Sequence, residues 1–288
     1  QWISKFEAED THRGSQQDVE WVNSKLVNFA LDLANDKSWD PVSAEPDVQV
    51  WRKYLSPDAK IAGKRVDQAA KFACVKAQAV IDAPLESVYE LFLDNKRVHE
   101  YNEYCKDVRD LEWLDDTTKV THSMTGRPWS RDFVTRVHYR ELGEDSRIVV
   151  NRAEEHALAG RMAGYTRMEM ALGANIMKRV PGSPEKTEFT LITHVNPGGF
   201  ASTPFGAMVT NRLSTESPKM FFSKLSKAAS KGNSDREGKG PFQPLRTIRG
   251  SVGGFVGAVG ALVAMKVLGI DNDEGHGDDM FTPVASAT

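Results

Sequence analysis

The groups that could do chemistry in this 288-residue chain are seven scattered histidines, two cysteines and one run of adjacent titratable side chains. That run is Glu154, Glu155 and His156, but neighbours on a strand point to opposite faces, so it indicates a solvated edge rather than a metal site. The motifs HExxH and G-x-S-x-G and a closely spaced Cys/His cluster do not occur in the sequence. We therefore expect no enzyme activity, no metal site and no cofactor.

The acidic end of the chain, DNDEGHGDDMFT, begins like a calcium-binding loop and then departs from one. Gly275 stands at the third ligand position, His276 at the position of the loop glycine, and Thr282 at that of the final glutamate. A net charge of -3, with basic residues that do not interleave with aromatic ones, gives no reason to expect a nucleic-acid partner. Cys74 and Cys105 make neither a disulfide framework nor a CxxC pair, which favours a reducing compartment.

The elements that must position these groups are several strands flanked by helices. In QDVEWVNSKLVNFALDLAND, apolar residues fall three or four apart after Asp18, a candidate N-cap, and predict a docked amphipathic helix. DAPLESVYELFL predicts a helix capped by Asp82 with Pro84 in its first turn, and Pro218 is expected to kink the closing helix. Helices are thus predicted over residues 17–35, 82–93, 96–104 and 207–229, and strands over residues 48–55, 72–81, 118–125, 132–139, 147–154, 165–172 and 188–195.

The clearest alternation lies in residues 133–140. One face carries Phe133, Thr135, Val137 and Tyr139, and the other carries Val134, Arg136, His138 and Arg140. Such a pattern is typical of an antiparallel sheet with one covered face and one wet face. Consecutive strands with flanking helices therefore predict an α+β fold built on a large antiparallel sheet.

Several segments, in this order along the chain, resemble the START (steroidogenic acute regulatory protein-related lipid transfer) family. AVIDAPLESVYELFLDNKRVHEYNEYCKDVRDL resembles the family's strand, two helices and next strand, and SRDFVTRVHY resembles its PRDFV strand, with Ser130 in place of the proline. VPGSPEKTEFTLITHVNPGGFASTPFG matches its loop, last strand and turn into the closing helix. The resemblance covers residues 17–230. It implies a helix-grip fold, in which a curved antiparallel sheet wraps around a long C-terminal helix and leaves an internal apolar tunnel.

The same resemblance implies that one lipid molecule is the ligand. Sterol-type members bury an acid and an arginine in the tunnel, and Ser123 and Val137 stand at the matching positions, which leaves the class of lipid open. Small Ala77 and Ala79 in a central strand fit either such room or tight packing.

The resemblance also implies a tunnel entrance between the Gly126–Ser130 loop, the Pro197–Gly206 loop and the closing helix. Trp129 and Phe200 in these loops either meet a membrane interface or fill the local core. The predicted tunnel and gate residues are Ala77, Ala79, Ser123, Trp129, Phe133, Thr135, Val137, Tyr139, Phe200, Phe205, Val209 and Leu213.

The stretch GSVGGFVGAVGALVAMKVLGI, residues 250–270, predicts a transmembrane helix. At about 1.5 Å per residue it is long enough to cross a hydrocarbon core of roughly 30 Å. A re-entrant or surface hairpin is the alternative. One face of this helix would carry small residues, which predicts a helical membrane-protein partner. The GxxxG-type packing would involve Gly250, Gly253, Gly254, Gly257 and Ala261.

The segments around this stretch set the predicted organisation. An N-terminal extension (1–16) precedes the START-like domain (17–230), while a basic Gly/Pro linker (231–249) and an acidic tail (271–288) flank the membrane segment. Because positive charge marks the side that is not translocated, the domain is expected to face the cytosol, stroma or matrix. The chain begins with Gln1, so a leader is expected to have been removed or omitted, and a chloroplast or mitochondrial membrane is a candidate location.

Two functions compete on these observations. The first is a membrane-tethered protein that binds, transfers or senses one lipid held in an apolar tunnel. The alternative is a structural or assembly subunit of a membrane protein complex, such as an organellar energy-transducing complex, that docks through the Gly-rich helix. An enzyme ranks last, because no residue stands out as a catalytic group.

Overall fold

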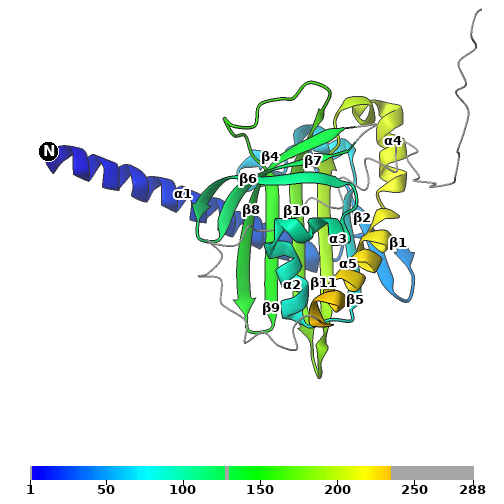
Figure 1. The fold of residues 1–288 in the computed structure, drawn as a ribbon. Coiled ribbons are helices and arrows are strands. Elements are labelled where there is room, and N and C mark those ends of the chain that lie inside the picture. The colour runs from blue at the N-terminus through cyan, green and yellow to red at the C-terminus, as the bar shows by residue number, and fades with distance from the viewer. Residues whose placement is uncertain (1, 127–129, 235–288) are drawn as a thin grey trace, which may run out of the picture.

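A computed structural model of the chain describes residues 2–126 and 130–234 (Figure 1). Within these residues nine strands form one sheet in the order β1-β2-β5-β11-β10-β9-β8-β7-β6, and β3 and β4 form a separate hairpin. The predicted α+β architecture with a large antiparallel sheet is confirmed. The strands are β1 (Asp40–Ala44), β2 (Val48–Lys53), β3 (Lys60–Ile61), β4 (Lys64–Arg65), β5 (Cys74–Ile81), β6 (Cys105–Asp115), β7 (Thr118–Thr125), β8 (Arg131–Gly143), β9 (Ser146–Ala153), β10 (Thr166–Val180) and β11 (Ser183–Asn196).

The sheet opens at the point where β9 ends. β9 pairs antiparallel with β10 as far as Asn151, which lies opposite Gly173. Further toward its start, β10 pairs instead with β8, in parallel, at residues 166–168. Residues 169–172 of β10 lie between these two pairings, so they border an opening in the sheet.

Helices α2, α3 and α5 cover one face of the sheet, which we term the inner face (Figure 1). In LESVYELFL the apolar residues recur at helical spacing, so α2 buries Leu85, Val88 and Leu91 against the strands. The helices of the described residues are α1 (Trp2–Asn35), α2 (Leu85–Leu93), α3 (Val98–Tyr101), α4 (Pro204–Leu213) and α5 (Ser217–Ser234), with 3-10 turns η1 (Asp67–Lys71), η2 (Asn95–Arg97) and η3 (Gly199–Ser202).

The other face, the outer face, is covered by α1, which runs behind the sheet in Figure 1. Leu26 and Ala30 of α1 are fully buried there, and Asn23 donates a hydrogen bond to Thr118 Oγ1 at 2.8 Å. The prediction that this face is wet is therefore wrong. His138 is 3% exposed, because α1 packs over it through Thr118 and Asn23, and Val134 is 2% exposed in a separate cluster with Val120 and Ala159.

Two predicted helix starts are also wrong. α1 begins at Trp2 and runs through the predicted boundary at residue 17, so Asp18 lies inside the helix instead of at its N-cap. α2 is preceded by Pro84 at the N-cap, and Asp82 forms an ion pair with Lys186 at 3.1 Å.

The closing helix is broken in two. α4 ends at Leu213, the turn at residues 214–216 follows, and Pro218 lies in the first turn of α5, where its missing N–H costs no helical hydrogen bond. Among the described helices, none is both long enough and apolar enough to cross a membrane. The predicted membrane segment (250–270), with Gly250, Gly253, Gly254, Gly257 and Ala261, and the predicted acidic tail lie outside the described residues.

Candidate functional site

The strand residues predicted to line a tunnel come together on the inner face. The sheet register sets Ser123 opposite Phe133, Ala77 opposite Leu191 and Ala79 opposite Phe189, so four strands contribute to one surface. The exposed fraction of every one of these predicted residues is 9% or less, for Ala77, Ala79, Ser123, Phe133, Thr135, Val137 and Tyr139.

Aromatic rings fill the space above β5 and β11. The ring of Phe189 lies 5.7 Å from that of Phe92, 6.0 Å from that of Phe221 and 5.7 Å from that of Phe222. The small side chain of Ala79, directly across the ladder from Phe189, leaves room for this cluster. Tight packing therefore accounts for alanine at this position.

A polar row crosses the other half of the inner face. Lys119 of β7 is fully buried, pairs with Asp110 of β6 at 2.9 Å, and lies over the rings of Trp113 and Tyr139. Burial lowers the pKa of Lys119, and the carboxylate of Asp110 opposes that shift. The residue types Lys and Asp are common at surfaces, so the sequence carried little signal that this pair lies inside.

Two asparagines extend this row onto β9 and β10. Asn151 and Asn175 are 0% and 1% exposed, and their side-chain amides have no hydrogen-bond partner within the described part of the chain. Gly173 leaves room for them, since a β-carbon there would lie 1.8 Å from Asn151 Oδ1 and this side chain would have to move. Unpaired buried amides are costly and rare, so this row is where the inner face can recognise an uncharged polar group.

An exposed apolar patch lies on η3 and α4, beside the start of β8. Phe200, Phe205 and Met208 are 55%, 62% and 61% exposed, and the two phenyl rings meet edge to face with centroids 6.4 Å apart. The guanidinium of Arg131 donates to the carbonyl of Pro197 and ties this loop to the sheet. We refer to Phe200, Phe205 and Met208 as the apolar patch.

Two of the remaining predicted gate residues belong to the same helix as Phe205 and Met208. Val209 is half-buried in α4, Leu213 is the last residue of that helix, and Trp129 lies outside the described residues. Asn211 of α4 joins the helix to the sheet, because its Oδ1 accepts a hydrogen bond from the backbone N–H of Ala73 at 2.8 Å. A cavity of about 20 Å³ remains between α4 and strands β5 and β11, enough for roughly one water molecule.

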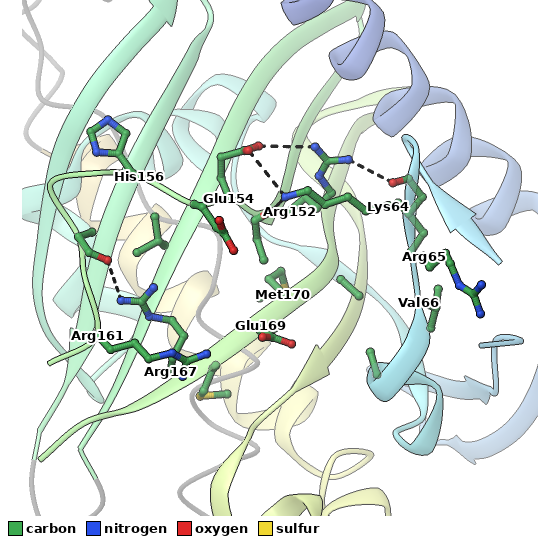
Figure 2. Close-up of a pocket in the computed structure, with 18 of the residues that line it drawn as sticks. Lys64, Arg65, Val66, Arg152, Glu154, His156, Arg161, Arg167, Glu169 and Met170 are labelled. Atoms are coloured by element: carbon green, nitrogen blue, oxygen red, sulfur yellow. Dashed lines mark hydrogen bonds and ion pairs between the residues drawn. The ribbon is translucent and has the colours of Figure 1, made fainter. Parts of the chain in front are cut away.

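A larger pocket of about 510 Å³ lies on the outer face, where the sheet opens (Figure 2). Its walls come from the β3–β4 hairpin, the segment after β9 and the start of β10. Glu154, Glu155 and His156, which the sequence indicated as a solvated edge, line this pocket. Sequence reasoning missed the pocket because the opening in the sheet is not visible in strand periodicity.

His122 and Cys105 are buried side chains with structural contacts. His122 Nε2 lies 2.9 Å from Asp132 Oδ2, which also accepts a hydrogen bond from Arg167 Nε at 3.0 Å. Asp132, near the start of β8, therefore holds both side chains in place. Burial raises the pKa of the Cys105 thiol to about 12, which leaves it unreactive. Over residues 2–126 and 130–234, no group of three His, Cys, Asp or Glu side chains is arranged to hold a metal ion.

Comparison with known proteins decides the family. The START domain model matches residues 34–231, most of the chain. This chain belongs to the START family. The family is known for lipid binding and transfer, and its members are generally not enzymes.

Other START proteins are similar to this one over most of their length. The steroidogenic acute regulatory protein, mitochondrial, of Mesocricetus auratus is 21% identical over 209 residues, which cover 69% of this chain and 72% of that protein. The structure of human StAR-related lipid transfer protein 5 matches with a TM-score of 0.62 at 18% identity, covering 75% of this chain and 98% of that one. Human STARD10 matches with a TM-score of 0.61 at 16% identity, covering 74% and 81%. At these identities the structures establish the START fold.

Proposed function

We propose that this START protein is a non-catalytic lipid carrier or sensor that holds one lipid between the inner face and the helices that cover it. The observation that carries the proposal is the apolar patch of Phe200, Phe205 and Met208, beside the end of a covered, largely apolar sheet face. Large exposed apolar groups on one loop and helix favour contact with a membrane surface, from which the lipid would enter.

The lipid class follows from the side chains of the inner face. Apolar residues of β8, β9 and β10 suit acyl or polycyclic hydrocarbon, which gains about 0.8 kcal/mol for each buried CH₂ group. Asn151, Asn175 and Ser123 supply neutral hydrogen-bonding groups, and Lys119 is already neutralised by Asp110. We therefore propose a lipid whose buried polar part is uncharged, such as a hydroxyl, ester or amide.

The proposal includes a membrane tether. The linker (231–249) would join the START domain to the predicted span (250–270), and the domain would face the cytosol, stroma or matrix. The Mesocricetus auratus relative is named as a mitochondrial protein, which supports the mitochondrial candidate among the organelles expected from the sequence. A tethered domain would serve only membranes within reach of its linker.

Lipid transfer between vesicles tests this function. The full-length protein is expected to co-purify with one lipid, identified by mass spectrometry, and to move that lipid from donor to acceptor vesicles. Phe200→Asp with Phe205→Asp is expected to slow transfer by at least about tenfold, because each phenyl ring contributes roughly 1.5–3 kcal/mol when it leaves water.

Leu158→Asp is the matched control, since Leu158 is an apolar side chain, 70% exposed, in the segment between β9 and β10. Equal transfer rates for the double variant and this control would refute the role of the apolar patch. Wild-type protein that neither carries nor transfers lipid would refute the carrier itself.

A further inference from the structure

The pocket on the outer face is separate from the site proposed above. It lies across the sheet from α2, α3 and α5, and about 510 Å³ is within the range of small-molecule sites. Figure 2 shows Lys64 entering from the β4 side, Arg161 and Arg167 on the opposite side, and Met170 between them. The proposed lipid site does not account for this pocket.

The floor of the pocket is apolar because the sheet is open beneath it. Met168 and Met170 belong to the core of the inner face and are each 1% exposed, yet they also line the outer pocket. Ile61, Val66 and Val134 add aliphatic surface around them. Methionine side chains adapt readily to the shape of an apolar ligand.

One wall of the pocket carries more positive charge than its acid can balance. Three cations converge on the single carboxylate of Glu154. Arg136 Nε lies at 3.2 Å, Arg152 Nη2 at 3.5 Å and Lys64 Nζ at 3.7 Å from its oxygens. The side chains of Arg136 and Arg152 are 12% and 6% exposed, so water screens this excess poorly.

Arg152 is the most buried of the three cations. Its Nη1 donates to the carbonyls of Ile61 and Ala62 at 3.2 and 2.7 Å, which fixes the guanidinium against the β3–β4 hairpin. Its Nε has no hydrogen-bond partner among the described residues. A buried guanidinium with an unused donor, beside two other cations, is a site where an anion is stabilised.

The acidic residues of the pocket do not remove this excess. The lining side chains include five basic residues, Lys64, Arg65, Arg152, Arg161 and Arg167, and three acidic residues, Glu154, Glu155 and Glu169. Glu154 is shared among the cations, and Glu169 already accepts a hydrogen bond from Asn196 at 3.3 Å. Arg65 pairs with Asp58 and Asp67, and Arg167 pairs with Asp132, so the positive excess is confined to the cations around Glu154.

We propose that this outer pocket binds a small amphiphilic anion, with its carboxylate or phosphate beside Lys64 and Arg152 and its apolar body on Met168 and Met170. Lys64 is half-exposed, so its flexible stem can turn from Glu154 toward the ligand. Such a ligand supplies the missing counter-charge and covers the apolar floor at the same time. The proposal does not depend on lipid transfer at the inner face.

Methyl NMR on the full-length protein, with ¹³C in the methionine methyl groups, tests this site. Decanoate is expected to shift the Met168 and Met170 signals and to bind at least about tenfold more tightly than decyltrimethylammonium, which has the same apolar chain and the opposite charge. Met177, which is fully buried in the core of the inner face, is expected to be unaffected. Shifts at Met177 alone, or equal affinity for the two probes, would overturn the proposal.

Two variants locate the anion and the apolar body. Lys64→Met is expected to weaken decanoate binding by about tenfold, while Lys60→Met, an exposed position in the same hairpin that does not line the pocket, leaves it unchanged. Ala171→Phe is expected to fill the pocket and abolish binding. Equal binding by wild type and the Lys64 variant would overturn the proposed anion position, even if the Ala171 variant fails to fold.

Vesicles distinguish a free anion from a lipid head group. If the same methyl signals respond to vesicles of phosphatidic acid with phosphatidylcholine more strongly than to decanoate, the anion is a membrane phosphate. If they respond to decanoate alone, the ligand is a free amphiphile. No response at Met168 and Met170 to either probe would overturn the site.

Discussion

Acid is expected to destabilise this protein through one buried histidine, His138, beneath α1. Burial lowers the pKa of His138 from 6.5 to about 4, with a further contribution from the nearby charge of Arg140. Its Nδ1 lies 3.0 Å from Thr118 Oγ1, which in turn accepts the hydrogen bond from Asn23 of α1. The neutral imidazole is therefore part of the contact that docks this helix on the sheet.

The loss of stability and the pH window in which it occurs follow from the pKa of His138 in the unfolded chain, 6.5, and in the folded protein, about 4. Below pH 6.5 the unfolded chain takes up a proton that the folded protein refuses until about pH 4, so stability falls as the pH drops through this window. At about 1.36 kcal/mol for each pKa unit, the full loss is roughly 3 kcal/mol, of which about 2.5 kcal/mol has occurred by pH 4.5. The free energy of unfolding of a domain is typically about 5–15 kcal/mol, so a loss of this size is large enough to measure.

Urea denaturation at pH 7.5 and pH 4.5 measures the effect. His138→Gln removes the titrating group, so the variant is expected to lose about 2.5 kcal/mol less than wild type between the two pH values. His99→Gln, at an exposed position of α3, is the control and should behave as wild type. Burial also lowers the pKa of His194, but that contribution is common to all three proteins and cancels in the comparison. An identical acid loss in wild type and the His138 variant would refute the reasoning.

Two further predictions concern the polar row of the inner face. Asp110→Asn is expected to lower the free energy of unfolding by about 3–5 kcal/mol in urea denaturation, because it leaves the ammonium of Lys119 buried and unpaired. Lys119→Met should lower it less, since Asp110 keeps the hydrogen bond from Asn95. The reverse order would show that the pair is not buried as described. Gly173→Ala is expected to destabilise the protein by about 1–3 kcal/mol through the clash with Asn151, and Asn151→Ala in the same chain should restore part of that loss; strictly additive effects in this double-mutant cycle would contradict the contact.

The strands with regular alternation could be predicted from the sequence with little error. The strand predicted over 118–125 coincides with β7, and the apolar face of residues 133–139 lies on the inner face as its period requires. β10 was predicted to end at residue 172 but continues to Val180. Its second half, GANIMKRV, has little alternation, because the sheet is covered on both sides there.

The candidate sites could be predicted only in part. Resemblance to the START family predicted that Ala77, Ser123 and Val137 share one face of the sheet, and the sheet register places all three on the inner face. The same reasoning did not find Asn151 or Asn175, because the residues next to an asparagine in a strand do not show whether its side-chain amide has a hydrogen-bond partner. Pairing depends on neighbours that the register brings from other strands.

The sequence by itself determined the period of the strands, the apolar stripe of α2 and the family, since each depends on residues close together in the chain or on a linear pattern. The tertiary structure decided which faces are wet and which charges meet. The alternation predicts a solvated face for His138 and Arg140, but Glu20 and Asn23 of α1, more than 90 residues away in sequence, lie over them. Glu154 likewise forms an ion pair with Lys64, which is distant from it in the sequence. A charge is exposed or buried according to what packs above it, and that depends on contacts between distant parts of the chain.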